Sequence, residues 1–306
     1  MAAASGERSG EGQRQGGKAM NKQSAERVWR LIKDLPLAAI LLLLPVTVCG
    51  LLGQFFIPHD PGAIDPSKAL RPPSWLIGAG WSHLFGTDYL GRDVFSRVIM
   101  GAQASLLVSF VGVGLAGLFG ITLGLLSAYF RSWVDTVVVM LIDIQRSMPA
   151  ILLALLLSAA LGSSGLGSVV IVVAIIYWTH YAMVVRGETL SVKQRDYVVM
   201  ARVLGATNKR ILAKHIFPNV IDSALVVASL QLGSAIMLEA MLSFLGMGVQ
   251  PPAVAWGKMI AESRLYIATA WWLPTFPGIA LVITVLGANL FGDWLRDRLD
   301  PKLRQV

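Results

Sequence analysis

Two ionisable residues lie within an otherwise apolar stretch and are the first candidates for chemistry. Asp143 and Arg146 are three residues apart, so on a helix their side chains share a face and are close enough to pair. Charges inside membrane-spanning helices are costly and commonly mark a functional path. Two interpretations stay open: the pair neutralises itself against a neighbouring helix, or it lines a path for a solute. In other apolar stretches, Glu239 and His180 are expected to be packing or interfacial residues.

No residue pattern predicts an enzyme active site. The sequence contains neither G-x-S-x-G nor H-E-x-x-H, and the turn at 162–165 lacks the spacing of a nucleophile elbow. Residues 86–93 approach the phosphate-binding pattern G-x-x-x-x-G-K-[ST], but Arg92 and Asp93 replace its Lys and Ser/Thr and no strand is predicted before it. We therefore expect no catalytic residue, no metal site and no cofactor bound by this chain.

The apolar stretches themselves predict an all-α membrane protein. Of the 306 residues, 55% are hydrophobic and only 14% are charged, whereas soluble domains carry roughly 25% charged residues. Several runs are long enough to cross a bilayer core, which needs about 20 apolar residues. The net charge of +8 lies mainly between these runs, unlike the solvated basic face of a nucleic-acid binder. Six transmembrane helices are predicted at 35–57, 102–130, 134–161, 168–185, 220–244 and 271–291.

The distribution of Lys and Arg predicts the orientation. These residues concentrate in both tails and in the loop 186–219, which the positive-inside rule assigns to the cytoplasm. Residues 1–19 contain almost no large apolar side chain that could be buried in a core. Deleting them is therefore expected to leave assembly and transport intact. The expected organisation is a disordered basic cytoplasmic tail at 1–34, a first transmembrane helix at 35–57, a periplasmic loop at 58–98, a core at 99–293 and a cytoplasmic tail at 294–306.

The loop 186–219 carries the most informative pattern. Apolar residues recur at helical spacing on both sides of Gly205, which predicts two short amphipathic helices. Gly205 suits the C-terminal turn of the first helix, Thr207 suits the N-cap of the second, and Pro218 suits its end. A folded helix pair that projects from the membrane is a docking surface, while an ordinary solvated loop is the alternative.

This loop resembles the corresponding loop of the membrane subunits of ATP-binding-cassette importers. Of the Glu-Ala-Ala triplet in their general signature, which falls at 199–201, only Ala201 is kept, and Phe217 replaces the Leu before the Pro. The dipeptide, oligopeptide and nickel group matches much better. Its positions are occupied by Asp196, Tyr197, Val198, Ala201, Arg202, Leu204, Gly205, Ala206, Arg210, Ile211, His215, Pro218 and Asn219. Residues 83–97 are similar to the segment before the second span of the group's C-type subunits, and residues 242–301 extend the match.

The resemblance implies a type I importer permease fold in a bacterial inner membrane. It implies a second permease subunit, two cytoplasmic ATPase subunits that bind ATP and Mg, an external solute-binding protein and membrane lipid as partners, with no nucleic acid. The implied cargo is a dipeptide, an oligopeptide or a related small solute, with nickel as the alternative. The residues expected to dock on the ATPase subunits are Ala201, Arg202, Gly205, Ala206, Thr207, Lys209 and Arg210.

Two other classes of protein fit less well. An ion-coupled secondary transporter would need intramembrane ionisable groups and broken helices in repeated halves, yet the sequence shows one charged pair and no evident repeat. A membrane-embedded hydrolase lacks its motifs. An apolar residue is commoner in the resembled group at position 146, so Arg146 is where a difference in substrate is expected.

Overall fold

The computed structural model of the chain describes residues 36–78, 82–162 and 165–299. The chain divides into two units, Met1–Leu37 and Ala38–Val306, and only the last two residues of the first unit are described. The expected tail at 1–34 and residues 300–306 of the expected C-terminal tail therefore lie outside the described residues. The features below belong to the second unit. The exception is Leu37, which is the first residue of the first described helix and the last residue of the first unit.

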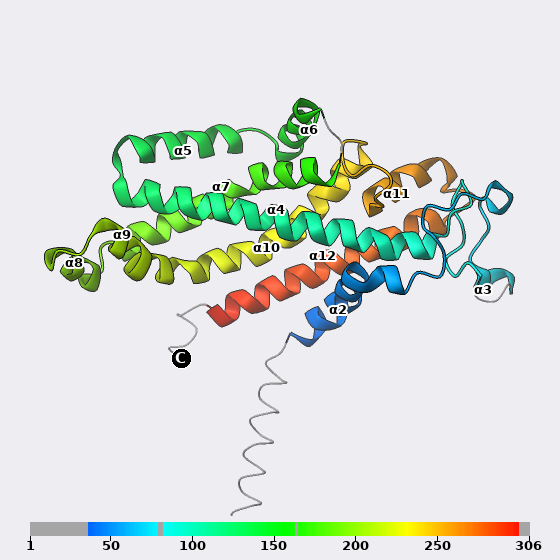
Figure 1. The fold of residues 1–306 in the computed structure, drawn as a ribbon, viewed down its shortest axis with the longest axis horizontal. Helices are drawn as coiled ribbons and strands as arrows, with labels where there is room; N and C mark the ends of the chain where they lie inside the picture. Colours follow the sequence, from blue (N-terminus) through cyan, green and yellow to red (C-terminus); the bar gives the residue numbers. More distant parts are fainter. Residues whose placement is uncertain (1–35, 79–81, 163–164, 300–306) are drawn as a thin grey trace, which may run out of the picture. The chain divides into compact units, whose positions relative to one another are not determined.

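The described residues form helices joined by turns (Figure 1). The longer helices are α2 (Leu37–Leu52), α4 (Val94–Phe130), α5 (Ser132–Arg146), α6 (Ala150–Leu161), α7 (Leu166–Val192), α10 (Phe217–Phe244) and α12 (Trp272–Leu299). The shorter ones are η1 (Gly53–Phe55), η2 (Pro66–Lys68), α3 (Ser74–Ile77), α8 (Asp196–Val203), α9 (Asn208–Arg210), η3 (Ile211–Ile216), α11 (Trp256–Ser263) and η4 (Arg264–Tyr266). Five described helical runs are long and apolar enough to cross a membrane, and α5 with α6 makes a sixth if the bent pair counts as one span. The predicted number of six spans is therefore reached when α5 and α6 are counted together.

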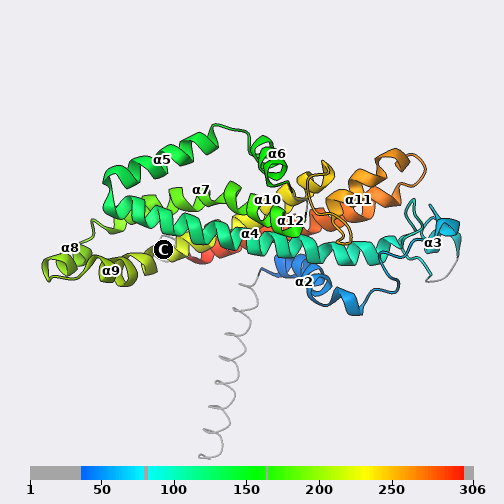
Figure 2. The same cartoon turned by 45° about the horizontal axis from the view of Figure 1, so that its top comes forward.

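A seam of small residues brings α4 against α7, and the two helices run side by side in both views (Figures 1 and 2). A Cβ at Gly120 would lie 2.3 Å from the carbonyl oxygen of Trp178 and 2.6 Å from the Cβ of Tyr181. Small residues at every fourth position allow such a close backbone approach between helices in a membrane. The buried members of this stripe on α4 are Gly112, Ala116, Gly120 and Gly124.

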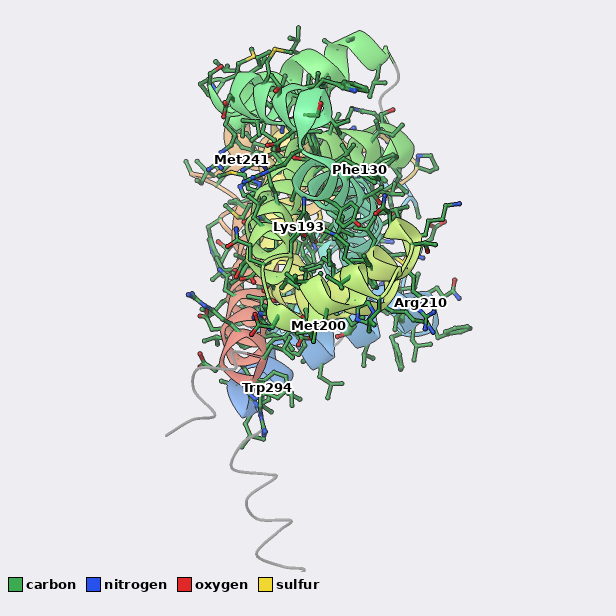
Figure 3. All side chains as sticks on the ribbon, turned by 90° about the vertical axis from the view of Figure 1, so that its left-hand side faces the viewer. Phe130, Lys193, Met200, Arg210, Met241 and Trp294 are labelled. Carbon is green, nitrogen blue, oxygen red and sulfur yellow. The ribbon has the colours of Figure 1, made fainter. Side chains whose placement is uncertain are left out.

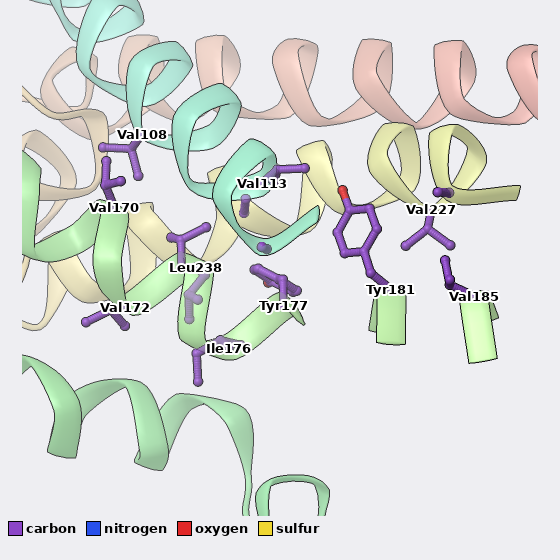
Figure 4. Packing of buried hydrophobic residues seen from close by; sticks show 14 of the residues in the cluster. Val108, Val113, Val170, Val172, Ile176, Tyr177, Tyr181, Val185, Val227 and Leu238 are labelled. Carbon is purple, nitrogen blue, oxygen red and sulfur yellow. The ribbon is translucent and has the colours of Figure 1, made fainter. Parts of the chain in front are cut away.

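The main apolar core lies where α4 and α7 meet α10 (Figure 4). Tyr177 on α7 donates a hydrogen bond from its hydroxyl to the carbonyl oxygen of Ser234 on α10, at 2.9 Å, so its polar group is satisfied within the core. The core residues labelled in the figure are Val108, Val113, Val170, Val172, Ile176, Tyr177, Tyr181, Val185, Val227 and Leu238.

The predicted span 134–161 is not one continuous helix. α5 ends at Arg146, α6 begins at Ala150, and their axes differ by 100°. Pro149 has no N–H to donate and its ring would collide with the carbonyl of Gln145 in a continuous helix, and the residue before a proline avoids the helical region. The prediction of a single helix is therefore wrong here, although Pro149 was the signal for a break.

Several helices extend beyond the predicted apolar runs. α4 begins at Val94, inside the expected loop 58–98, because the Asp93 side chain accepts a hydrogen bond from Ser96 N and caps the helix. α7 continues to Val192, so the first residues of the expected loop 186–219 are helical. Pro45 lies inside α2 and does not interrupt it. Hydrophobicity marks the part of a helix within the bilayer, whereas capping groups decide where the helix ends.

The seam on α4 gives a first testable prediction. Gly120→Val should place two methyl groups against the backbone of α7 and cost about 1 to 3 kcal/mol or more through overpacking. Gly114→Val is the matched control, since a Cβ there meets nothing within 4 Å. The measurement is the thermal unfolding midpoint of the full-length chain in detergent. Equal midpoints for the two variants would contradict the role of the seam.

Candidate functional site

The first predicted helix of the loop is α8, and it ends as the glycine pattern requires. Gly205 has φ +80°, a left-handed conformation that glycine adopts without strain. Gly205 N donates to the Arg202 carbonyl and Ala206 N donates to the Ala201 carbonyl, both at 3.0 Å. These two bonds form a Schellman motif, which satisfies the last carbonyls of α8. The predicted role of Gly205 in the C-terminal turn of this helix is confirmed, and Ala201, Arg202 and Ala206 supply the other groups of the motif.

The second predicted helix starts as expected but does not stop. Thr207 Oγ1 accepts a hydrogen bond from Arg210 N, so Thr207 is the N-cap of α9. The helix then widens into the π-helix η3 and runs directly into α10. The predicted end at Pro218 is wrong, because Pro218 lies in the first turn of α10 and the wider π turn accommodates a residue that has no N–H and needs room for its ring.

The outer face of this helix pair combines exposed apolar and basic side chains (Figure 3). Val203 and Leu204 are 76% and 84% exposed, and Met200 is also exposed. Lys209 and Arg210 are exposed at the start of the second helix. Apolar side chains gathered on an exposed face mark a contact surface for a partner. We call Met200, Arg202, Val203, Leu204, Lys209 and Arg210 the docking face.

The inner face holds the pair against the bundle. Val198 of α8 and Ile211 and Ile216 of η3 are fully buried and belong to the main core. Burying a large aliphatic side chain contributes about 1.5 to 3 kcal/mol. The alternative of an ordinary solvated loop is therefore contradicted by the packing.

A polar anchor at the end of α4 adds to this packing. The hydroxyl of Tyr129 donates to Asn208 Oδ1 at 2.7 Å, and Lys193 Nζ donates to the carbonyl oxygen of Tyr129. The Lys193 ammonium and the Arg202 guanidinium both lie over the Tyr129 ring, a favourable placement for cations. Burial, together with the charges of Arg202 and Arg131, lowers the pKa of Lys193. Tyr129 is not predictable as an anchor from the sequence, because it lies at the end of a long apolar run, where an aromatic residue is expected to belong to the core.

Asp143 and Arg146 lie near the end of α5, but among the described ion pairs there is none between them. Both side chains are exposed, and Arg146 contacts the sulfur of Met183 on α7. Gln145, between them, accepts a hydrogen bond from Trp178 Nε1 and donates one to the carbonyl oxygen of Ile176, which ties α5 to α7. The interpretation of a self-neutralising pair is therefore wrong for this structure.

Asp135 forms the ion pair on α5 that sequence analysis did not identify. Both of its carboxylate oxygens accept from Arg186 on α7, at 2.7 and 2.8 Å, and one also accepts from Ser127 Oγ on α4. A bidentate Arg to carboxylate bond fixes the relative position of the two helices. A cavity of about 420 Å³ opens beside this pair and is lined by both Asp135 and Asp143. Asp135 and Arg186 are 51 positions apart in the sequence, so local residue spacing does not predict their ion pair.

The segment 83–97 forms a charged cap where α4 begins, at the opposite end of that helix from α8 (Figures 1 and 2). Arg92 donates to Asp88 at 2.6 Å and to Glu262 of α11 at 3.1 Å, and Arg97 lies within 3.7 Å of both carboxylates. Gly91 has φ +78°, and a Cβ there would lie 1.8 Å from the carbonyl oxygen of Asp65. The ion pairs and the close approach at Gly91 give this loop a structural role.

Glu239 ties α10 to α4 in the part of the bundle near this cap. Its side chain is fully buried and accepts hydrogen bonds from Ser105 Oγ at 2.9 Å and Ser243 Oγ at 2.7 Å. Ser243 Oγ in turn accepts from the backbone N–H of Val249. A buried polar group is tolerated when it is satisfied in this way. The expectation that Glu239 is a packing residue is confirmed.

These features define a multi-span helical membrane protein that presents a folded docking face outside its apolar bundle. Residues 120–305 match the family model described as binding-protein-dependent transport system inner membrane component. The chain belongs to this family of inner-membrane permease subunits.

Curated relatives cover nearly the whole chain. A probable D,D-dipeptide transport system permease protein of Escherichia coli is 41% identical over 282 residues, which is 91% of this chain and 91% of that protein. A di/tripeptide transport system permease protein of Pseudomonas aeruginosa is 40% identical and covers 88% of this chain and 89% of its own length. A glutathione transport system permease protein of Pectobacterium atrosepticum is 39% identical, with 90% of each chain covered.

Two solved structures share the fold. The inward-facing MetNI methionine ABC transporter gives a TM-score of 0.53 at 20% identity, covering 67% of this chain and 96% of that chain. An amino acid ABC transporter with histidines gives a TM-score of 0.50 at 17% identity, covering 69% and 95%. The chain therefore has the fold of an ABC importer permease, as the sequence predicted.

The anchor at Tyr129 gives the second prediction. Tyr129→Phe removes the hydrogen bond to Asn208 and should cost about 1 kcal/mol of local stability, which corresponds to a roughly fivefold rise in amide exchange over 196–216. Tyr197→Phe is the control, since Tyr197 is exposed. Hydrogen exchange measured by mass spectrometry on the full-length chain compares the two. A rise of the same size in the control would show that the Tyr129 bond does not hold the helix pair.

Proposed function

We propose that this chain is the membrane subunit of an ATP-driven importer of short peptides. Three relatives at 39 to 41% identity are named for D,D-dipeptides, di/tripeptides and glutathione, and all three cargoes are short peptides. The complex would include a second permease subunit, two ATPase subunits that hold ATP and Mg, and an external solute-binding protein. The chain itself would hydrolyse nothing.

The observation that carries the coupling role is the exposed docking face on a helix pair whose other side is locked into the core. Leu204 and Val203 expose most of their surface while Val198 and Ile211 expose none. In the proposed complex, the cytoplasmic ATPase subunits cover the apolar centre, and Arg202, Lys209 and Arg210 lie at its rim. An apolar centre with a charged rim is the usual anatomy of a protein interface.

A continuous helical backbone would transmit a movement of the docking face to the membrane-spanning helices. α9, η3 and α10 form one uninterrupted helical run from Asn208 to Phe244, so a displacement of the docking face moves α10 directly. On the other side, the Tyr129 anchor joins Asn208 to the end of α4. ATP-driven closure of the partner subunits would thereby shift α10 relative to α4 and alternate the access of the path.

Asp143 and Arg146 remain our candidates for the translocation path. Both side chains are exposed on α5 and unpaired with each other, and Asp143 lines the cavity of about 420 Å³ beside the Asp135–Arg186 pair. A zwitterionic peptide presents one ammonium and one carboxylate, which separate charges of opposite sign could attract. An importer of nickel or another small solute of the same group is the alternative function.

The third prediction tests the coupling turn. Gly205→Val forces a β-branched residue to φ +80° and should cost about 1 to 3 kcal/mol of backbone strain, which disorders the Schellman turn and abolishes ATP-driven uptake. Gly205→Asn is the matched control, because asparagine tolerates left-handed φ and a Cβ at this position meets nothing within 4 Å. Co-purification of the ATPase subunits and uptake by reconstituted vesicles are measured together. Normal docking and uptake in Gly205→Val would disprove the coupling role.

The fourth prediction tests the path. Arg146→Leu should change the relative uptake of acidic, neutral and basic dipeptides while the complex assembles normally. Arg296→Leu, the same change at an exposed position of α12, should leave the preference unchanged. Stability changes from Arg146→Leu and Asp143→Asn should add within about 0.5 kcal/mol, because the side chains do not pair. An unchanged preference in Arg146→Leu would remove this residue from the path.

A further inference from the structure

A second group of chemistry-bearing side chains lies away from both the docking face and the path. His59, His83 and Asp93 each bring one nitrogen or oxygen atom into a cluster in which these atoms all lie within 4.8 Å of one another. His83 Nδ1 is 3.0 Å from Asp93 Oδ1, and His59 Nδ1 is 3.9 Å from Asp93 Oδ2. The two imidazole rings stack at 4.7 Å. Two of the chain's four histidines therefore meet at one buried carboxylate.

The backbone holds these residues in place independently of the rings. The backbone of His83 is fixed by Ser74, whose Oγ accepts from His83 N at 2.9 Å and donates to His83 O at 2.8 Å. The backbone N–H of His59 donates to Ser96 Oγ at 3.3 Å. Asp93 Oδ2 accepts from Ser96 N at 2.8 Å and from Ser96 Oγ at 2.7 Å. The cluster is thus preorganised by bonds outside it, as ligand sites require.

One ring atom points to a missing partner. His59 Nδ1 is buried and has no hydrogen-bond partner among the described residues. The Asp93 side chain is 1% exposed, that of His83 is 12% exposed and that of His59 is 38% exposed, so the cluster is closed on the Asp93 side and reachable on the His59 side. A buried nitrogen without a partner loses hydration without compensation. A bound cation would satisfy it.

We propose that His59 Nδ1, His83 Nδ1 and Asp93 bind one Zn²⁺ ion, with water in the fourth position, and that the ion clasps the segment after α2 to the start of α4. Zn²⁺ prefers this set of imidazole and carboxylate donors at about 2.0 to 2.2 Å, and tetrahedral geometry places neighbouring donors about 3.3 Å apart. His83 Nδ1 lies 3.0 Å from one Asp93 oxygen, His59 Nδ1 lies 3.9 Å from the other, and one ligand atom from each residue lies within 4.8 Å of the other two, so the three donors must draw slightly closer to reach that spacing. Binding through His83 Nδ1 requires the ring to carry its proton on Nε2, so the hydrogen bond between His83 and Asp93 is given up when the ion binds.

A bound cation would also offset the negative charge of Asp93 at the start of α4. Asp93 is the N-cap of α4, where backbone N–H groups already offset part of its charge. Asp93 Oδ2 accepts from Ser96, whereas Asp93 Oδ1 faces His83 Nδ1. The ion would replace the hydrogen bond between His83 and Asp93, and it would be bound by two imidazole nitrogens as well as by the carboxylate. His59 and His83 are 24 positions apart and neither stands in a metal-binding motif, so this site is not predictable from residue spacing.

The test uses the full-length chain in detergent, purified with a tag that contains no histidine. Zn²⁺ is titrated against a competing chromogenic chelator, with Co²⁺ absorption as a second probe of tetrahedral coordination. We expect one Zn²⁺ per chain, and His59→Ala should weaken binding at least tenfold. His59→Ala is the informative variant since its ring makes no hydrogen bond in the described structure, whereas His83→Ala also removes the bond to Asp93. The double variant His180→Ala/His215→Ala, which alters the other two histidines, is the matched control.

Thermal unfolding provides an independent readout. An ion that binds only the folded chain raises the unfolding midpoint, so Zn²⁺ should raise it in the wild type and in the control but not in His59→Ala. The proposal is overturned if the wild type retains no Zn²⁺ against the chelator, or if His59→Ala binds Zn²⁺ as tightly as the wild type does.

Discussion

The close approach of α4 to α7 is the constraint on which the rest of the structure depends. Lipid offers no hydrophobic force between helices inside a bilayer, so packing and polar contacts must hold them together. The glycine seam centred on Gly120 lets the two backbones touch. Tyr177 on α7 donates a hydrogen bond to α10, and Glu239 on α10 accepts one from Ser105 on α4. α10 packs against both of these helices, and α12 packs mainly against α10.

The two ends of α4 have different designs. At one end the cap is held by ion pairs among Asp88, Arg92, Arg97 and Glu262, which keep charged groups satisfied where the chain leaves the apolar bundle. At the other end a single tyrosine, Tyr129, joins α4 to the docking helix pair. At this end the buried side chains of Val198, Ile211 and Ile216 add apolar packing to the tyrosine bond, so the two ends of α4 are held by different kinds of interaction.

The sequence predicted those features that depend on local chemistry. The αL turn at Gly205 and the cap at Thr207 follow from residue type alone and are found as expected. The run through Pro218 was mispredicted, because a proline normally ends a helix and the π turn that accommodates it has no sequence signature. The Asp135–Arg186 bond and the His59, His83 and Asp93 cluster depend on chain segments that only the fold brings together.

The bend between α5 and α6 has a consequence for the surroundings of the chain. At 1.5 Å per residue, α5 with 15 residues and α6 with 12 residues are about 22 and 18 Å long, and each falls short of the roughly 30 Å hydrocarbon core. Non-helical backbone at membrane depth is stable only against protein or water, because lipid cannot satisfy its polar groups. The peptide units at 147–149 therefore need protein or water beside them rather than lipid, and in the proposed complex a companion subunit would cover this elbow.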